Sequence, residues 1–457
     1  LQDFNPNDVH HIINHSESVF LFVSDRIWDS LEEDKIEEVR GVFSLSDYRC
    51  LHQRDGENIQ KLMKSLDEKM TEKYPDGFTQ EDIKYAELDN DKVVEINYTS
   101  GTTGFSKGVM LTGNNLAGNV TYARTLDLLF RGERELCFLP LAHAYSCAFN
   151  LLVPMAFGVH VYLLGKVPSP KILLKAFEEV KPNLILMVPL ILEKIYKKMI
   201  LPQLNKRTLK LALNIPLLDS RIYAQIRKHL VDALGGRFRE VIVGGAAMNQ
   251  EVTDFLYKIK FPFTISYDHN NEYVPGSCGQ ILKGIMKVRI DSEDPYNKVG
   301  EIQVSGENVM KGYYKNDEAT QNVFTEDGWL RTGDLGTIDH DNRIFIRGRS
   351  KTMILGASGQ NIYPEEIESK LNNLPFVMES LVVEKNGKLI GMVYPDYDTV
   401  DSTGISHTDL PVIMEQNRIE LNKLLAPYET ISEIQLYPTE FEKTPKKSIK
   451  RYLYSNY

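Results

Sequence analysis

The sequence predicts an α/β protein with a large N-terminal domain of βαβ subdomains, a β-rich subdomain inside it, and a small α+β domain at the C-terminal end. The length of 457 residues exceeds what one ordinary hydrophobic core accommodates. Short apolar runs alternate with amphipathic segments over the first half, and the pattern then changes twice. The composition, 42% hydrophobic and 25% charged, is that of an ordinary soluble globular protein.

The region from about Ser18 to Val243 alternates predicted strands with predicted helices. Two segments repeat apolar residues at intervals of three and four, as helices do: SPKILLKAFEEVKP and LILEKIYKKMI. The β-rich apolar runs are SVFLFVS, VVEINYTS, ELCFLP, VHVYLL and NLILMVP. This alternation predicts βαβ units on a largely parallel sheet.

Two further regions follow the strand pattern REVIVGG. Short strands broken by Gly, Asp and Asn predict a β-rich subdomain over about 275–348, which completes an N-terminal domain of residues 1–348. Residues 349–457 begin like a hairpin and continue with a helix starting near Pro364. Two strands joined at Asn386–Gly387, another helix and a basic tail complete the pattern. This region predicts an independent α+β domain.

Charge and apolar patterning restrict the class of partner. The net charge of −10 disfavours nucleic acid, which needs a concentrated basic face. The most apolar stretch, Leu151–Leu164, is interrupted by Pro154 and Gly158 and is shorter than the roughly 20 residues of a membrane span. The first residues lack the basic and apolar parts of a signal peptide. We expect a cytoplasmic protein with small-molecule ligands, while peripheral contact with a membrane surface and the oligomeric state stay open.

The four cysteines lie far apart, without a C-x-x-C pair or a histidine cluster at metal-ligand spacing. They are Cys50, Cys137, Cys147 and Cys278. This spacing favours reduced thiols over a disulfide framework or a zinc site.

The strongest local signal is the loop Thr99–Gly108, which follows a predicted strand and precedes a helical pattern. Its glycines permit backbone amides to face an anion, its hydroxyls donate to phosphate oxygens, and Lys107 supplies positive charge. A flexible turn is the plain alternative. It is no Walker loop, since Lys107 precedes Gly108 and no Ser or Thr follows the lysine, so a P-loop NTPase is disfavoured. The predicted phosphate-binding residues are Thr99, Ser100, Gly101, Thr102, Thr103, Gly104 and Lys107.

The string TSGTTGFSKG resembles the signature of the adenylate-forming superfamily at every fixed position. With LPLAHAYS and GGAAMN, it is most similar to the long-chain fatty-acyl-CoA ligases, and the resemblance runs along nearly the whole chain. It implies an ATP-dependent enzyme that converts a fatty acid to acyl-AMP, releases pyrophosphate and then forms the coenzyme A thioester. ATP, Mg²⁺ and coenzyme A are the implied cofactors, with Thr103 at the metal and Lys107 among the catalytic residues.

The resemblance also implies roles for residues outside the loop. His143, in Leu139–His143, matches the position beside the reacting carboxylate, although a lone histidine is more often structural. Asp334, in Trp329–Asp334, matches the carboxylate that accepts from both ribose hydroxyls. Arg349 matches the family's arginine that contacts the ribose or a phosphate. Gly244, Gly245 and Ala246 match the segment that packs against adenine and the acyl chain. The alternative is that they form an ordinary turn between a strand and a helix.

The resemblance implies roles for three positions in the C-terminal region, which in the family turns between two orientations during the reaction. Lys351 falls at the hinge about which the small domain turns, and Gly359 where the backbone passes close to pantetheine. The stretch that contains Gly359 and Pro364 resembles the loop that lines the thiol tunnel. The alternative is that Pro364 simply begins a helix, a position that proline favours. In the tail, relatives place a lysine where this chain has Ser448, so the nearest amine is Lys447. Lys446, Lys450 and a solvated basic tail are its alternatives.

The chain departs from the family pattern in two further ways. The family begins with roughly one more βαβ unit, and it carries a Gly-x-Thr-Glu segment whose glutamate helps to hold magnesium. No such segment occurs in 261–279. The absent glutamate segment and the shifted tail lysine leave open a catalytically impaired relative that binds nucleotide or fatty acid. An acyl-AMP ligase that loads a carrier protein also stays open, because it would share every motif above and differ only in the acceptor.

Overall fold

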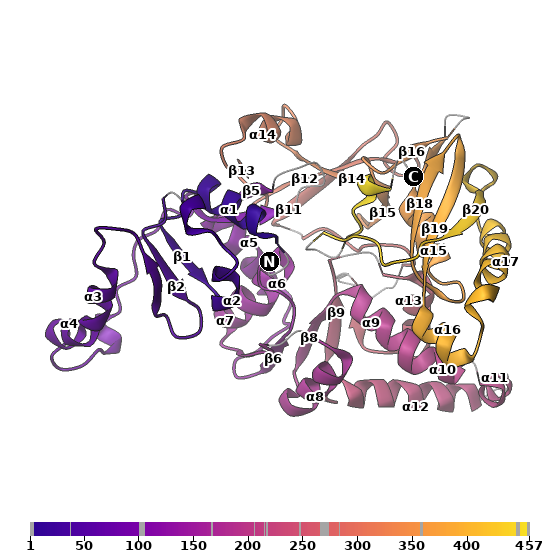
Figure 1. The fold of residues 1–457 in the computed structure, drawn as a ribbon. Coiled ribbons are helices and arrows are strands. Elements are labelled where there is room, and N and C mark those ends of the chain that lie inside the picture. Colours follow the sequence, from indigo (N-terminus) through magenta and orange to yellow (C-terminus); the bar gives the residue numbers. More distant parts are fainter. Residues whose placement is uncertain are drawn as a thin grey trace. The chain divides into compact units, whose positions relative to one another are not determined.

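The computed structural model comprises two compact units (Figure 1). Unit 1 contains residues 1–114, 310–320 and 443–448, and unit 2 contains residues 115–309, 321–442 and 449–457. The residues that the structure describes are 4–36, 38–99, 106–165, 168–204, 206–213, 215, 218–245, 248–265, 274–282, 284–356, 360–444 and 448–454.

Unit 1 holds two small three-stranded sheets, in the orders β1-β2-β3 and β13-β5-β4. The first has a parallel pair, β1 with β2, whereas the second is antiparallel throughout. The run VVEINYTS is thus a strand, as predicted, but it lies outside the parallel sheet. The elements are α1 (Pro6–His15), β1 (Phe20–Val23), α2 (Asp25–Trp28), β2 (Gly41–Ser44), β3 (Cys50–Gln53), α3 (Ile59–Lys64), α4 (Leu66–Lys73), β4 (Val93–Thr99), β5 (Lys107–Thr112) and β13 (Gly312–Tyr313).

Unit 2 contains the predicted parallel sheet, in the strand order β10-β9-β8-β6-β7. Its central strand β8 is buried along its whole length, because helices cover both faces of such a sheet. The strands are β6 (Arg134–Cys137), β7 (His160–Leu163), β8 (Leu184–Met187), β9 (Glu240–Val243) and β10 (Phe263–Thr264). The helices are α5 (Gly113–Ala123), α6 (Ala144–Ser146), α7 (Val153–Phe157), α8 (Pro170–Val180), α9 (Pro189–Ile195), α10 (Leu201–Leu204), α11 (Arg207–Ala212), α12 (Leu218–Ala233) and α13 (Gln250–Lys258).

Side chains of the parallel sheet alternate between two apolar cores. Ile185 and Met187 of β8 face the larger core, together with residues of α8, α12 and α13. Leu184 and Leu186 face the smaller core on the opposite side. Two helical segments adopt the wider π-helical winding: Cys147–Leu152, between α6 and α7, and Tyr196–Ile200, which continues α9. The predicted helix LILEKIYKKMI is therefore α-helical in its first part only.

The predicted β-rich region forms a four-stranded antiparallel sheet in the order β11-β12-β14-β15. Its elements are β11 (Met286–Asp291), β12 (Gly300–Gly306), α14 (Asp317–Val323), β14 (Leu330–Ile338) and β15 (Ile344–Arg349). β-Bulges interrupt the register of β14 with both of its neighbours.

The C-terminal region has the predicted hairpin, helices and strands. Asn386 and Gly387 both have positive φ and form the turn between β18 and β19, where Lys385 pairs with Lys388. β20 adds to β19 in parallel, and α15 and α17 pack on this sheet (Figure 1). The elements are β16 (Ile354–Leu355), β17 (Asn361–Ile362), α15 (Pro364–Leu371), β18 (Val377–Lys385), β19 (Lys388–Pro395), α16 (Tyr397–Thr403), α17 (Leu410–Asn422) and β20 (Ile431–Leu436). The division of the chain into domains at Arg349 stays a prediction.

Candidate functional site

The predicted phosphate loop is the turn of an antiparallel hairpin in unit 1. Thr99, the last residue of β4, pairs with Lys107, the first residue of β5. Lys107 begins strand β5, and the helix predicted after the loop is α5, which starts at Gly113. The apolar run Val109–Leu111 completes a ladder with β4 and β13, which satisfies its backbone groups without a helix. Ser100, Gly101, Thr102, Thr103 and Gly104 lie outside the described residues.

Gly108 allows the base of this hairpin to close tightly. A Cβ at this position would lie 2.8 Å from Ile96 Cγ2 and 3.1 Å from Tyr98 Cζ. The Lys107 ammonium lies 5.0 Å from the ring centroid of Tyr313, within the range of a cation–π contact. The one charged side chain of the predicted loop is therefore held on an aromatic face.

A contact that the sequence did not reveal joins α1 to the same hairpin. Tyr98 Oη lies 2.7 Å from His15 Nδ1, and the His15 ring also meets the Tyr314 ring edge-on at 5.7 Å. Burial, with the neighbouring Tyr314, raises the pKa of Tyr98 to about 12, so its hydroxyl keeps its proton at neutral pH. Burial, with the charges of His11 and Lys315, lowers the pKa of His15. No local motif marks His15, because its partner lies far along the chain.

The predicted ribose and phosphate ligands of unit 2 come together across one strand pair. Asp334 of β14 is the register partner of Arg349 of β15, and Arg349 Nε lies 2.8 Å from Asp334 Oδ1. The Asp334 side chain is 24% exposed and that of Arg349 is 60% exposed, so both are accessible to a ligand. Burial raises the pKa of Asp334; Arg349 opposes this shift, and Glu365 adds to it.

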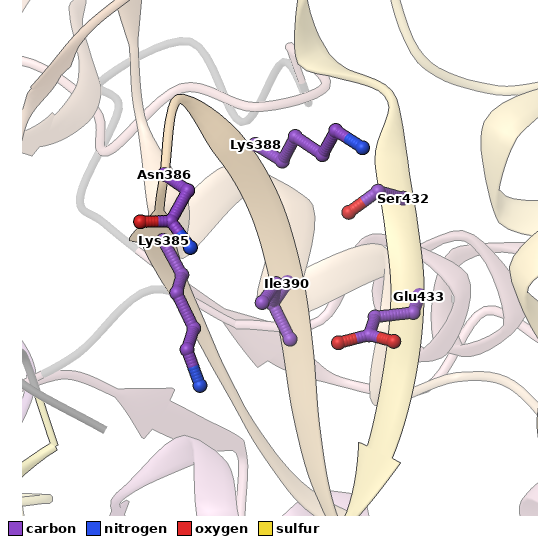
Figure 2. A pocket seen from close by; sticks show the side chains of 6 residues that line it. All are labelled: Lys385, Asn386, Lys388, Ile390, Ser432 and Glu433. Atoms are coloured by element: carbon purple, nitrogen blue, oxygen red, sulfur yellow. The ribbon is translucent and has the colours of Figure 1, made fainter.

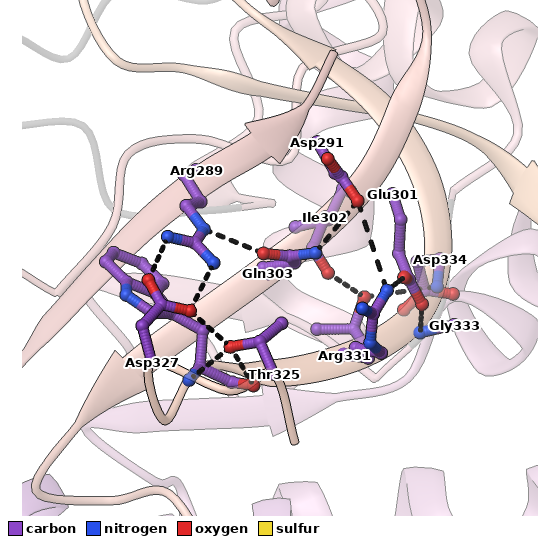
Figure 3. A network of polar contacts seen from close by, with 12 residues as sticks. Arg289, Asp291, Glu301, Ile302, Gln303, Thr325, Asp327, Arg331, Gly333 and Asp334 are labelled. Carbon is purple, nitrogen blue, oxygen red and sulfur yellow. Dashed lines mark hydrogen bonds and ion pairs between the residues drawn. The ribbon is translucent and has the colours of Figure 1, made fainter. Parts of the chain in front are cut away.

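A polar network shapes the turn before Asp334 (Figure 3). Gly333 has a left-handed φ of +73°, which favours glycine, and its amide donates to Glu301 Oε1 at 3.2 Å. The other oxygen of Glu301 accepts from Arg331 at 3.0 Å. The Thr332 hydroxyl donates to the Ile302 carbonyl at 2.7 Å and accepts from the Asp334 amide at 3.1 Å. Strand β12 therefore holds the Thr-Gly-Asp turn, a support that the motif alone did not predict.

The structure also brings the predicted His143 segment to the Gly-Gly turn. His143 precedes α6, its amide donates to the Pro140 carbonyl at 3.0 Å, and its carbonyl accepts from Cys147 at 2.8 Å. A Cβ on Gly244 would lie 3.0 Å from the ring of Tyr145. Gly245 has a φ of +86°. The absence of a side chain at Gly244 thus allows close approach of the Tyr145 ring, and the packing of adenine against this turn stays a prediction. Ala246 lies outside the described residues.

The hinge and tail residues are only partly described. Lys351 is exposed, and the two residues after it donate their amides to the Arg349 carbonyl. Arg451 forms ion pairs with Glu368 and Glu365 of α15, which ties the end of the tail to that helix. Sequence analysis missed this anchor, because an arginine in a basic tail has no distinguishing local pattern. Gly359 and Lys447 lie outside the described residues.

A separate open pocket lies at the β18–β19 turn and β20 (Figure 2). Its lining is Lys385, Asn386, Lys388, Ile390, Ser432 and Glu433. No residue of the predicted site contributes to it. The pocket is lined by two lysines and one glutamate. This mixed charge does not indicate a particular class of ligand.

Within the described part of the chain, no group of three or more His, Cys, Asp or Glu side chains could hold a metal ion. The predicted metal ligand Thr103 lies outside that part. A search of the same residues finds no helix with the length and apolar character needed to cross a membrane.

Comparison with known proteins finds one family and many relatives. A profile of the family described as "AMP-binding enzyme" matches residues 2–314. The long-chain-fatty-acid–CoA ligase FadD15 of Mycobacterium tuberculosis is 29% identical over 411 residues, which cover 78% of this chain and 66% of that protein. The 4-coumarate–CoA ligase of Pinus taeda is 31% identical over 350 residues, covering 74% and 62%. The chain thus spans just under two thirds of the length of these relatives.

Solved structures with a similar fold cover nearly the whole chain. The ATP-bound MatB from Rhodopseudomonas palustris superposes with a TM-score of 0.72 at 20% identity, over 99% of this chain and 82% of that one. The Bacillus subtilis o-succinylbenzoate–CoA synthetase MenE in complex with AMP gives 0.69 at 21% identity, over 98% and 80%. The predicted fold class is confirmed by these similarities.

Proposed function

The chain belongs to the family of AMP-binding enzymes, and on this basis we propose that it is an ATP-dependent long-chain fatty-acid–CoA ligase. The observation that carries the proposal is the pairing of Asp334 with Arg349, which puts an acceptor-only carboxylate and a guanidinium side by side on two accessible strands. A ribose with two hydroxyls next to a phosphate is the ligand that complements this pair.

The proposed reaction has two steps and needs no side-chain nucleophile. A carboxylate oxygen of the acid attacks the α-phosphorus of ATP, which enters with Mg²⁺ on its phosphates, and the bond to pyrophosphate breaks. The thiol sulfur of coenzyme A then attacks the acyl carbon, and AMP leaves. The protein contributes positioning and stabilisation of developing charge.

Each predicted residue has a place in this scheme. Lys107 and the loop hold the leaving phosphates, while Asp334 and Arg349 hold the nucleoside. His143 donates to an oxygen at the reacting junction, and Lys447 neutralises charge there during adenylation. Gly359 lets the backbone approach pantetheine after the C-terminal region turns about Lys351.

The acid is the finer part of the proposal. Relatives named for long-chain fatty acids support a fatty acid. A planar aryl acid is the second candidate, because another relative is named a 4-coumarate–CoA ligase.

The decisive experiment is acid-dependent exchange of labelled pyrophosphate into ATP. Fatty acids of increasing length and 4-coumarate are compared, and acyl-CoA formation is then followed by mass spectrometry. Exchange that requires a long-chain acid, with turnover that requires coenzyme A, is the expected result. Preference for 4-coumarate would support the aryl alternative, and turnover only with a carrier protein would change the acceptor. ATP binding without exchange for any acid would overturn the proposal.

A further inference from the structure

The carboxyl group of Glu135 is buried in the middle of the parallel sheet. Glu135 lies on β6, has no exposed surface, and is the register partner of Leu184 on β8 and Val161 on β7. Leu184 faces the smaller apolar core, so Glu135 faces that core too. Burying a carboxyl costs free energy unless hydrogen bonds compensate, which makes its partners informative.

A chain of three polar side chains leads from Glu135 toward the His143 segment. The Asn150 amide donates to Glu135 Oε1 from the π-helical segment Cys147–Leu152. The Ser146 hydroxyl lies 3.0 Å from Asn150 Oδ1 and 3.2 Å from the Leu139 carbonyl oxygen, so two acceptors share its single proton. Ser146 is 1% exposed, and Asn150 is fully buried.

The chain ends on the turn that carries His143. Leu139 opens this turn, and the His143 amide donates to the Pro140 carbonyl within it. The helical segment that carries Ser146 and Asn150 begins directly after His143, whose carbonyl accepts from the Cys147 amide. The buried network therefore joins both sides of His143 to strand β6.

We propose that Glu135, Asn150 and Ser146 form a buried positioning network that holds His143 in place for adenylation. The inference rests on the proposed function, because it concerns the same reaction. None of the three side chains needs to touch substrate. They act on the orientation of the turn, in the way that supporting hydrogen bonds fix a catalytic histidine.

The surroundings of Glu135 favour its neutral form. Oε1 accepts from Asn150, and the buried Oε2 has no hydrogen-bond partner, so an ionised carboxylate would be poorly compensated. Burial raises the pKa of Glu135 to about 8, against the effect of the Asn150 hydrogen bond. A negative charge on Glu135 contributes to raising the pKa of two neighbouring groups, the thiol of Cys137 on β6 and the phenol of Tyr145 on α6. The register partners of Glu135 on β7 and β8 are apolar, so they cannot compensate a negative charge on its carboxyl group. Ionisation of Glu135 above about pH 8 should therefore disturb the network.

The first test is a mutant cycle between Ser146 and His143, followed by acid-dependent pyrophosphate exchange. Ser146→Ala should lower the maximal exchange rate about tenfold, the effect of one buried hydrogen bond, and leave the KM for ATP unchanged. In a His143→Ala background, Ser146→Ala should have almost no further effect, because residues that act as a unit are not additive. Thr253→Val is the matched control: it removes another buried hydrogen bond, at 2.8 Å to the Asn249 carbonyl, and should leave the rate unchanged.

The second test is the pH profile of Glu135→Gln. Glutamine keeps an acceptor for Asn150 but cannot ionise, so the variant should keep the rate at neutral pH and lose the decline expected of the natural protein above about pH 8. An equal effect of Ser146→Ala in both His143 backgrounds, or an unchanged alkaline decline in Glu135→Gln, would overturn the inference. Absence of exchange in the unsubstituted protein would instead overturn the proposed function, so the two failures are distinguishable.

Discussion

Asp334 was predicted as a ligand from a motif, and the structure shows which residues hold it in place. Its motif predicted a ribose ligand, and the structure places it opposite Arg349 and next to the turn that Glu301 supports. The neighbouring contacts explain why the motif needs its threonine and glycine. Thr332 bonds to β12, and Gly333 adopts the left-handed conformation that directs the chain into Asp334.

We predict that Asp334→Ala slows both half-reactions, because ribose is held in each. The expected loss is about 2 to 4 kcal/mol of transition-state binding, typical of charged hydrogen bonds in a shielded site. Pyrophosphate exchange and thioester formation from supplied acyl-AMP measure the two steps. Asp232→Ala, on the exposed surface of α12, is the control and should behave as the unsubstituted protein. Near-normal exchange in Asp334→Ala would reject the ribose assignment.

At the scale of elements, the β4–β5 hairpin carries the predicted phosphate loop. Its base is enclosed by Ile96 and Tyr98 from β4 and by Tyr313 beside Lys107. His15 of α1 holds Tyr98 in turn. The strands on either side of the loop are thus packed closely against aromatic side chains.

Gly108→Ala tests this close fit. The added methyl group would lie 2.8 Å from Ile96 Cγ2, a branch atom with little freedom to move, so we expect a destabilisation of about 1 to 3 kcal/mol. The ATP KM should rise with it, because Lys107 is the adjacent residue. Denaturant unfolding and exchange kinetics measure both effects. Gly118→Ala, in helix α5 with ordinary contact distances, is the control and should be neutral or stabilising. An unchanged midpoint and KM in Gly108→Ala would contradict this view of the hairpin.

At the scale of the whole molecule, the buried Glu135 links stability to pH. The folded protein retains its proton up to about pH 8, whereas the unfolded chain releases it near the ordinary value of 4.5. The folded state therefore binds more protons across this interval, so the stability that this group contributes is complete below about pH 4.5 and is lost as pH rises to about 8.

The predicted measurement is the free energy of unfolding across that pH range. It should decline by about 4 kcal/mol more in the natural protein than in Glu135→Gln. Glu87→Gln, at an exposed position in unit 1, serves as the control and should retain the decline. Parallel curves for the natural protein and Glu135→Gln would show that the group is already ionised in the folded state.

The prediction for Lys447 concerns the proposed movement of the C-terminal region between the two reaction steps. Forming acyl-AMP brings an anionic carboxylate to an anionic phosphate, so an amine there stabilises the transition state more than the ground state. We predict that Lys447→Ala lowers adenylation by roughly 10² to 10³ and nearly spares thioester formation from supplied acyl-AMP. Lys446→Ala and Lys450→Ala are the matched controls. Equal loss in both steps, or none in the first, would reject Lys447.

The sequence by itself determined the family, the fold class, and the strands and helices with strong periodicity. Local patterns carry this information: β8 is continuously apolar because both of its faces are buried, and Asn386–Gly387 favours the positive φ of a hairpin turn. The motifs also led to the prediction that Asp334 and Arg349 are ligands, since contiguous residues suffice to recognise them.

Only the tertiary structure decided which distant residues support those motifs. The contacts of His15 with Tyr98, of Glu135 with Asn150 and of Arg451 with Glu368 join separate elements. The strand that begins at Lys107 was not predicted for the same reason, because its ladder partners include β13, about two hundred residues away. Such pairings depend on packing and burial, which no local window of sequence records.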